Sequence, residues 1–204
     1  MRSNKKLPRI DHSNNPGVLF EIGHGHPVVV FNVGTHGDEY QPVLAARLFI
    51  RNFEPELLVK GTIKIIIANK PAFRKKKRFI YKDLNRAYPG NQKSKGESRI
   101  AAQMLKLVKD ADYVIDLHTA PNSEPFVVKK KKNRKRLQLA ELAPVKNIVL
   151  FEADKPCAMV DFTRCGIGIE LGDHDDSAST LLGLKVIHTY LFGLGLLKSD
   201  QSCL

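Results

Sequence analysis

The chain has 204 residues, of which 43% are hydrophobic and 26% are charged, and this balance excludes a mostly disordered or collagen-like protein. Two short basic runs, at residues 74–78 and 129–136, hold the whole formal net charge of +12, and the rest of the chain is neutral. Such local basicity suits an anion-facing patch better than a protein that coats nucleic acid.

Three cysteines, none of them in a CxxC pair, exclude a disulfide framework and a four-thiolate metal site. The first fifteen residues lack the apolar stretch of a signal peptide. The longest apolar segment, at residues 181–197, contains Lys185 and His188 and is too short and too polar to span a bilayer. We therefore expect a single soluble, cytoplasmic domain over residues 1–204, with no membrane partner.

Six short runs rich in valine and isoleucine have the length and composition of β-strands, and four segments with helical spacing lie between them. This alternation indicates an α/β fold in which helices cover both faces of a sheet. Several runs, such as IKIIIA and YVIDL, are apolar throughout, as expected of strands buried on both faces. The predicted strands are 18–22, 28–33, 62–68, 113–117, 148–151 and 167–171, and the predicted helices are 40–52, 97–109, 134–142 and 179–197.

Residues 69–96 fit neither periodicity, although they contain the first basic run and the motif DLNRAYPG. A loop of that length inside a compact domain is usually functional, and we expect the same here. A second irregular stretch, 172–177, is expected to cap the last helix with its acidic residues. We expect His24 and His26 to lie in an exposed turn, and the basic run at 129–136 to lie on a solvated face.

The strongest signal for a functional site follows the strand predicted at 28–33. Two glycines flank His36 there, and Glu39 comes three residues after it. In open α/β sheets, ligand sites lie beyond the carboxyl ends of strands. If a helix starts near Glu39, both side chains can point to one place, as zinc or a similar ion requires. The alternative is a glycine turn in which His36 and Glu39 only cap the helix.

A second strand also ends in a histidine. His118 follows the strand predicted at 113–117, and Asp116 projects to the same side of that strand. Asp116 is therefore placed to orient the ring of His118, although a buried histidine bonded to this aspartate in a purely structural role is the alternative. Two pairs of histidine and acid at strand ends favour a metal site more than either pair does alone.

Glu170 ends a third β-type run and has Gly168 and Gly172 on either side. These glycines let a backbone or a ligand approach closely, which is unusual around a purely solvated charge. A carboxylate near a metal-bound water can act as its general base. The alternative is an ordinary glutamate on an edge strand.

Taken together, these motifs resemble those of the succinylglutamate desuccinylase/aspartoacylase family, a branch of the zinc carboxypeptidase-like hydrolases. The resemblance covers residues 28–172 and implies a three-layer α/β/α fold with a mixed, mostly parallel central sheet. The matching motifs are GTHGDE at 34–39, the segment from Asn69 through Arg78 to DLNR at 83–86, DLHT at 116–119 and GIE at 168–170.

The same resemblance implies a role for each candidate residue. One Zn²⁺ per chain would be held by His36, Glu39 and His118. Glu170 would be the base that activates water and then returns a proton to the leaving amine. Asn85 and Arg86 match the pair that binds a substrate carboxylate in the family, and a guanidinium fork suits that task.

The resemblance thus predicts a zinc-dependent deacylase whose partner is a small anionic N-acyl amino acid. A carboxypeptidase-like peptide hydrolase using the same site is an alternative. A nucleic-acid-binding protein that uses the basic runs is less favoured, because aromatic residues make up only 7% of the chain and tryptophan is absent. Histidine and carboxylate ligands would also accept cobalt, manganese or iron. The sequence leaves open whether the chain forms a homo-oligomer.

The chain departs from the family in two respects. Aspartoacylase-type members carry an arginine that supports the oxyanion two residues after the equivalent of Asn69, where this chain has Pro71. Lys70, Arg74 and Arg164 are the candidates to replace it. Many members also add a small C-terminal β-rich domain, which we do not expect here because the chain ends soon after the last predicted helix.

Overall fold

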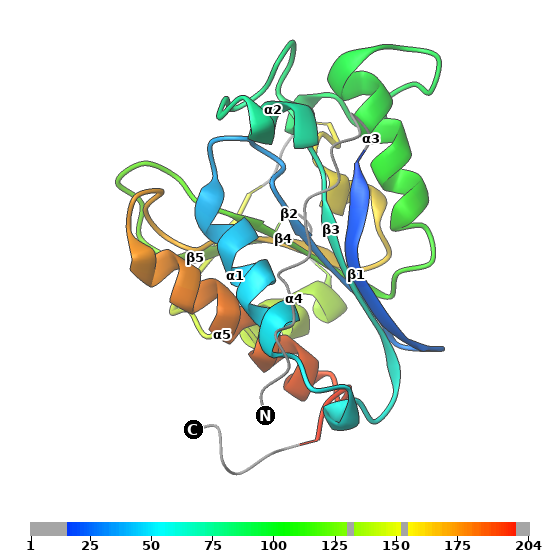
Figure 1. The fold of residues 1–204 in the computed structure, drawn as a ribbon, viewed down its shortest axis with the longest axis vertical. Coiled ribbons are helices and arrows are strands. Elements are labelled where there is room, and N and C mark those ends of the chain that lie inside the picture. The colour runs from blue at the N-terminus through cyan, green and yellow to red at the C-terminus, as the bar shows by residue number, and fades with distance from the viewer. Residues whose placement is uncertain (1–15, 130–132, 152–154, 199–204) are drawn as a thin grey trace.

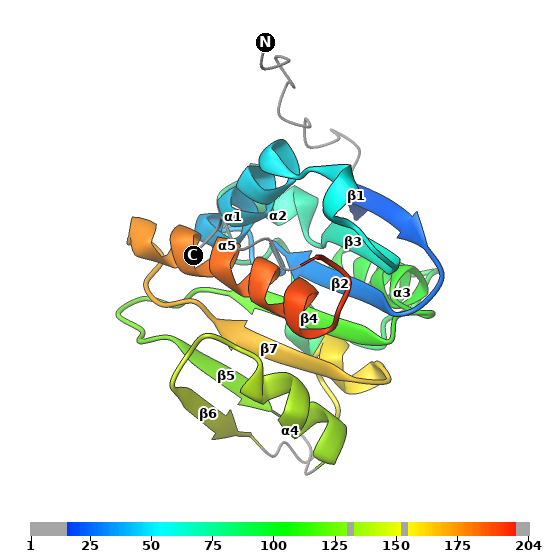
Figure 2. The same cartoon turned by 90° about the horizontal axis from the view of Figure 1, so that it is seen from below.

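The computed structural model describes residues 16–129, 133–151 and 155–198, and its centre is one seven-stranded sheet (Figure 1). Seen end-on, the strands run in the order β1-β3-β2-β4-β7-β5-β6 (Figure 2). The β1–β3 and β5–β7 pairs are antiparallel, and the other four neighbouring pairs are parallel. The strands are β1 (Gly17–His24), β2 (Val28–Val33), β3 (Gly61–Ile67), β4 (Tyr113–His118), β5 (Phe126–Lys129), β6 (Asn147–Leu150) and β7 (Gly166–Glu170).

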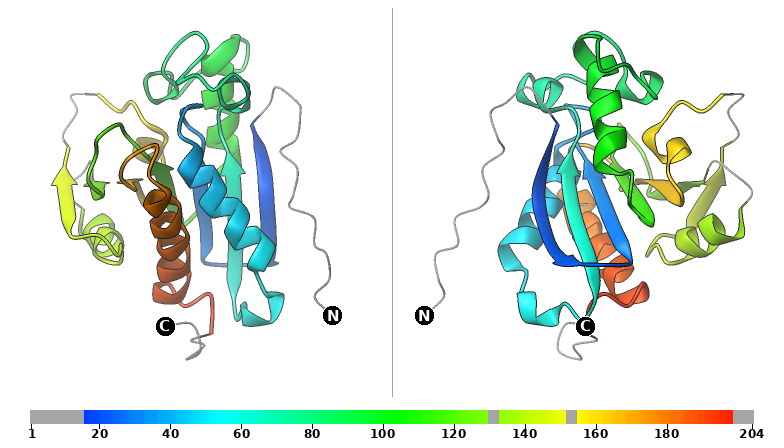
Figure 3. Two further views of the ribbon diagram at one scale, coloured as in Figure 1. Left: turned by 60° about the vertical axis from the view of Figure 1, so that its left-hand side comes forward. Right: turned by 90° about the vertical axis from the view of Figure 1, so that its right-hand side faces the viewer.

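Helices cover both faces of this sheet (Figure 3). On one face α1 (Tyr40–Asn52) packs beside α5 (Ser177–Gly193), and α4 (Arg134–Glu141) joins them through a hydrogen bond from Tyr190 Oη to the carbonyl of Leu139. On the other face lies α3 (Gly96–Leu107). The three-layer α/β/α arrangement with a mixed, mostly parallel sheet is therefore confirmed.

The central strands are buried because their apolar residues alternate between two cores. In β2, Val29 and Phe31 pack under α1 and α5, whereas Val30 packs under α3. The same alternation places Ile65 and Ile66 of β3 on opposite faces. A strand with helices on both sides is apolar at most positions, which explains the nearly continuous apolar runs in the sequence.

Two local predictions were wrong. Strand β5 was not predicted, because only three apolar residues precede the run of lysines that begins at Lys129. The strand forms by pairing with β7, where Val127 lies opposite Ile169. Arg136 does not lie on a solvated face: it is 3% exposed, and its Nη2 donates to the carbonyls of Val160 and Thr163, at 3.0 Å each. Lys130, Lys131 and Lys132 of the same basic run lie outside the described residues.

The segment at 69–96 is more ordered than the sequence suggests. It contains a short helix, α2 (Lys70–Arg74), and a 3-10 turn at Leu84–Arg86 that is capped by Asp83. The last helix begins earlier than predicted, at Ser177, and Asp176 caps it by accepting a hydrogen bond from Ala178 N, as expected of that acidic stretch. Among the described helices, none is both long enough and apolar enough to cross a membrane.

Asp112 secures the start of β2, and we expect Asp112→Asn to lower the free energy of unfolding by about 1 kcal/mol at neutral pH. Its carboxylate accepts a hydrogen bond from Val28 N at 2.8 Å and lies 2.5 Å from His26 Nδ1. Burial opposes ionisation, but these contacts and Arg164 together outweigh it and hold the pKa of Asp112 below its usual value.

A lowered pKa in the folded state means that this stabilisation is complete above the unfolded-state pKa and is lost as the pH falls through the folded-state pKa. Urea unfolding at about pH 7 should therefore separate the two proteins, and at about pH 3 the difference should shrink. Asp110→Asn, an exposed neighbour, is the control and should change neither. Equal unfolding midpoints for the wild type and Asp112→Asn at pH 7 would contradict the prediction.

Candidate active site

Three parallel strands bring the candidate residues to one edge of the sheet. Strand β4 lies between β2 and β7, and the three run parallel. His118, the last residue of β4, is in register with Glu170, the last residue of β7. His36 follows the end of β2 by three residues, so segments far apart in sequence meet at the carboxyl ends of these strands.

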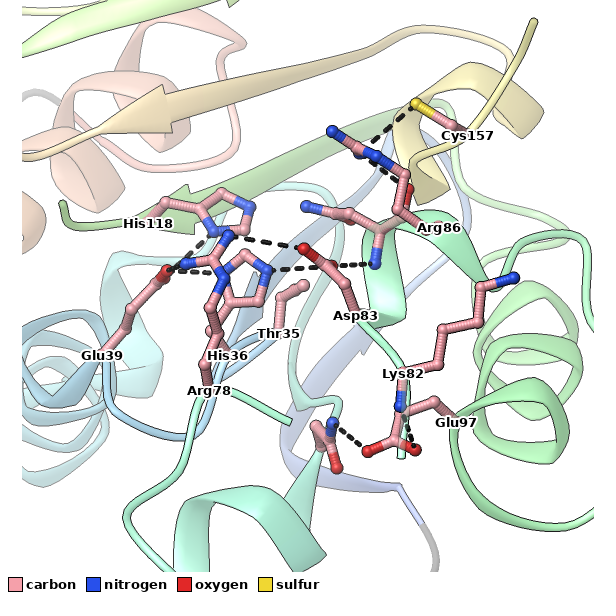
Figure 4. Close-up of polar contacts among 12 residues, drawn as sticks. Thr35, His36, Glu39, Arg78, Lys82, Asp83, Arg86, Glu97, His118 and Cys157 are labelled. Atoms are coloured by element: carbon pink, nitrogen blue, oxygen red, sulfur yellow. Dashed lines mark hydrogen bonds and ion pairs between the residues drawn. The ribbon is translucent and has the colours of Figure 1, made fainter. Parts of the chain in front are cut away.

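His36, Glu39 and His118 form a compact buried cluster (Figure 4). Each offers one ligand atom, and these atoms all lie within 4.8 Å of one another. Glu39 Oε1 is 2.5 Å from His36 Nδ1, and Glu39 Oε2 is 3.0 Å from His118 Nδ1. Two imidazole nitrogens and a carboxylate oxygen are a common set of protein ligands at catalytic zinc sites, so the chemistry of this cluster fits such an ion.

The other nitrogen of each histidine ring contacts the carboxylate of an aspartate. Asp116 Oδ2 lies 3.1 Å from His118 Nε2, and Asp83 Oδ1 lies 3.2 Å from His36 Nε2. Asp116 is itself fixed, because its Oδ1 accepts hydrogen bonds from Thr35 Oγ1 and Asn32 Nδ2 at 3.0 and 2.7 Å. Metal-binding histidines are usually oriented in this way, and the contact predicted between Asp116 and His118 is present.

Two glycines shape the turn that carries His36. Gly34 has a φ of +63°, in the left-handed region that glycine adopts most easily. Gly37 lies against α2, where a Cβ atom would sit 2.1 Å from the backbone carbonyl carbon of Ala72. Glu39 occupies the position before α1 but makes no capping hydrogen bond with its side chain. Its carboxylate faces the two histidines instead, which argues against the capping alternative.

The electrostatics of the cluster follow from burying opposite charges together. Burial would raise the pKa of Glu39, but His118 and His36 outweigh it and hold that pKa at about 2. Burial also disfavours protonated histidine, yet the pKa of His36 is raised by Asp83 and Glu39, and that of His118 is raised well above its usual value by Asp116 and Glu39. An ionised carboxylate between two proton-attracting rings is a donor set of the kind that can exchange protons for a divalent cation.

Glu170 faces the same space but is held differently. Its Oε2 is buried and has no hydrogen-bond partner within the part of the chain that the structure describes. Burial raises the pKa of this carboxyl, with the nearby His118 opposing the effect. A carboxyl with a raised pKa, aimed into a cavity beside a candidate metal centre, is suited to take up and release a proton.

The cavity at this site has a volume of about 190 Å³, and the segment at 69–96 supplies much of its polar wall. Asn85 and Arg86 both line it, as predicted for substrate-binding residues, and Asn85 Oδ1 is buried without a partner in the described chain. Arg86 Nη1 lies 3.6 Å from Cys157 Sγ (Figure 4). The opposite wall is apolar and comprises Val128, Phe151, Ala158 and Val160.

Arg78 and Asp83 are residues at this site to which no role was assigned from the sequence; Asp83 contacts His36 Nε2, and Arg78 lies beside Glu39. Arg78 Nη1 is 3.7 Å from Glu39 Oε1, its Nη2 is 3.5 Å from Asp83 Oδ2, and the side chain lines the cavity. As the last member of a basic run, it was interpreted as part of a charged patch. Nothing within the run of five basic residues at 74–78 marks Arg78 as the one that reaches the site.

Aspartoacylase-type members of the family carry an arginine where this chain has Pro71. The three candidates to replace it, Lys70, Arg74 and Arg164, do not line the cavity. Lys70 is buried, and a Cβ at Gly17 of β1 would meet its Nζ, so it points toward that edge strand. Arg164 pairs with Asp112 near the start of β2, and Arg74 lines a different cavity. Among the described residues, the arginine whose guanidinium approaches the cluster is Arg78.

Comparison with known proteins identifies similar chains. The family model for the succinylglutamate desuccinylase/aspartoacylase catalytic domain matches residues 11–182. A probable aspartoacylase of Prochlorococcus marinus (strain MIT 9312) is 30% identical over 189 residues, which cover 84% of this chain and 62% of that protein. A succinylglutamate desuccinylase of Photorhabdus laumondii is 30% identical over 138 residues, which cover 58% of this chain and 42% of that protein. The chain thus spans less than two thirds of either relative.

Solved structures share the fold. The product-bound ectoine utilization protein EutE (DoeB) from Ruegeria pomeroyi superposes with a TM-score of 0.78 at 22% identity, over 88% of this chain and 61% of that one. A succinylglutamate desuccinylase/aspartoacylase from Rhodobacter sphaeroides gives a TM-score of 0.74 at 24% identity, over 87% of this chain and 58% of that one.

Proposed function

This chain belongs to the succinylglutamate desuccinylase/aspartoacylase family, and from that premise we propose that it is a metal-dependent hydrolase that deacylates small anionic N-acyl amino acids. The observation that carries the proposal is the convergence of the ligand atoms of His36, Glu39 and His118 within 4.8 Å, with Glu170 facing the same cavity. Deacylation is the chemistry named by the family model and by the similar curated proteins.

We assign one Zn²⁺ per chain to His36, Glu39 and His118, whose donor atoms and outer carboxylates suit it. A zinc ion held there would lower the pKa of a water molecule to about 7 and polarise the amide carbonyl. Asp116 and Asp83 keep the two rings oriented while substrate enters and product leaves.

Glu170 handles the proton in this proposal. Water adds to the amide carbon, the carbon–nitrogen bond breaks, and the products are a carboxylic acid and an amine. Glu170 takes a proton from the attacking water and delivers it to the departing nitrogen, so the carboxylate is restored at the end of the cycle. Its raised pKa and lack of a hydrogen-bond partner in the described chain support this role.

In this proposal, arginine side chains stabilise the negative charges of the reacting substrate. Arg78, beside Glu39, would stabilise the charge that develops on the carbonyl oxygen. Arg86 and Asn85 would bind the carboxylate of the amino-acid half, where the planar guanidinium can make two parallel hydrogen bonds. A peptide C-terminus would fit the same clamp, which keeps a carboxypeptidase-like activity as the second candidate.

The test is a substrate panel on purified protein of known metal content. We expect about one zinc per chain and faster hydrolysis of N-acyl amino acids, such as N-acetylaspartate or N-succinylglutamate, than of short peptides. Arg86→Ala should raise KM about 10- to 100-fold for a carboxylate-bearing substrate and leave its neutral amide analogue unaffected. Faster cleavage of peptides would favour the carboxypeptidase-like alternative, and equal activity of metal-free protein would overturn the proposal.

A further inference from the structure

Glu97 is a buried carboxylate outside the proposed catalytic set. It lies in the first turn of α3 and is 2% exposed. Its Oε1 accepts hydrogen bonds from Ile80 N at 2.7 Å and from Asn69 Nδ2 at 3.4 Å. Its Oε2 accepts from Tyr81 N at 3.2 Å and from Lys82 N at 3.4 Å. Figure 4 shows Glu97 beside Lys82. Three consecutive backbone amides of the cavity-lining segment therefore converge on one side chain.

These contacts do not serve the helix that carries Glu97. A glutamate in the first turn is favoured by the helix dipole, but the oxygens of Glu97 accept their hydrogen bonds from the segment at 69–96. A buried negative charge is tolerated only where donors satisfy it, and here N–H groups of that segment do so. Removing the carboxylate would leave three backbone amides and the buried side-chain amide of Asn69 without this acceptor, and each lost hydrogen bond would weaken the hold on the segment.

The anchored residues lie directly beside the functional ones. Residues 80–82 follow Arg78 and immediately precede the turn that carries Asn85 and Arg86. The start of this stretch is held by a hydrogen bond from Gly37 N to the carbonyl of Arg78 at 3.2 Å. Asn69, which contacts Glu97, also contacts the turn that follows β2, since its backbone N–H donates to the carbonyl of Gly34 at 2.9 Å.

We propose that Glu97 is a positioning residue that holds Arg86 and Asn85 in place to bind the substrate carboxylate. The inference rests on the proposed function, because it takes Arg86 and Asn85 as the carboxylate clamp. Glu97 contacts this segment through the backbone at 80–82 and the side chain of Asn69, and it lines a different cavity from the one that Arg86 lines. Its loss should therefore affect recognition of the carboxylate more than the metal centre or the proton transfer.

The experiment compares Glu97→Ala and Glu97→Gln with wild type in the zinc-loaded protein, using an N-acyl amino acid and its neutral C-terminal amide. Glu97→Ala should raise KM about tenfold for the carboxylate substrate and change neither kcat for the amide nor the zinc content. Glu97→Gln should lie between, because its amide oxygen can still accept from Ile80 N but its nitrogen cannot accept from Tyr81 N or Lys82 N. Hydrogen exchange at residues 80–82 should accelerate at least about tenfold in Glu97→Ala.

Val186→Ala is the matched control, because it truncates a fully buried side chain in α5 and destabilises the fold away from this segment. Val186→Ala should leave unchanged the preference for the carboxylate, meaning the ratio of kcat/KM for the N-acyl amino acid to that for its neutral amide. An unchanged preference in both Glu97 variants, or an equal loss in Val186→Ala, would overturn the proposal. If Glu97→Ala does not fold, Glu97→Gln supplies the same comparison. Absence of hydrolysis in the wild type would instead refute the proposed function. Hydrogen exchange would still test whether Glu97 holds the backbone at residues 80–82.

Discussion

The Glu170→Gln variant is expected to keep its zinc and to hydrolyse N-acyl amino acids about 10²–10⁴-fold more slowly than wild type. Glutamine has nearly the same shape as glutamate but cannot take up and return a proton at this position. Glu170 is proposed to act on both water and the leaving nitrogen, so its loss should lower kcat more than it raises KM. Steady-state kinetics together with elemental analysis of the same preparation measure both effects.

Glu141→Gln provides the control for this comparison, because Glu141 is exposed at the end of α4 and should be silent. A zinc-loaded Glu170→Gln or Glu170→Ala protein with full activity would refute the role assigned to this carboxylate. Loss of zinc along with activity would instead place Glu170 among the residues that bind the metal, contrary to the proposal.

The His118→Ala variant is expected to lose metal and activity together. Loss of an outer-shell partner typically weakens metal affinity about 10- to 100-fold, and loss of one of the three proposed protein ligands should exceed that. The remaining Glu39 and Asp116 carboxylates would also face each other without the imidazole that now lies between them. Elemental analysis should fall well below one zinc per chain, and activity should drop by more than about two orders of magnitude.

His24→Ala is the matched histidine control, since His24 lies exposed at the end of β1 and outside the cluster. In wild type, a chelator should abolish activity and added zinc should restore it. Stoichiometric zinc in His118→Ala would show that the metal is held elsewhere, and the assigned ligand set would then be wrong.

The candidate site divides into residues that local spacing can find and residues that it cannot. His36 and Glu39 lie three positions apart on one turn, so their convergence follows from local backbone geometry. His118 and Glu170 were found because each ends an apolar run, and parallel strands bring their carboxyl ends to the same edge of the sheet. Arg78 was missed because in a run of five basic residues nothing local distinguishes the one that reaches the site.

The fold shows the same division. The strands predicted at 28–33 and 62–68 are buried on both faces, and their continuous apolar composition indicates this without any partner being known. Strand β5 has too short an apolar run to be recognised and exists because β7 offers it a pairing edge. Arg136 is buried because two carbonyls from a distant turn accept its hydrogen bonds, which a charged run in a sequence does not indicate.

The sequence by itself determined the α/β class, the burial of the central strands and the residue types available for chemistry, because these depend on hydrophobic periodicity and on contacts between neighbours along the chain. Only the tertiary structure decided that Arg78 lies beside Glu39 and that Glu97 anchors residues 80–82. The physical reason is that hydrogen bonds and ion pairs between distant segments depend on how the layers pack. A charged side chain has the same local pattern whether it faces water or accepts hydrogen bonds from the amides of another segment.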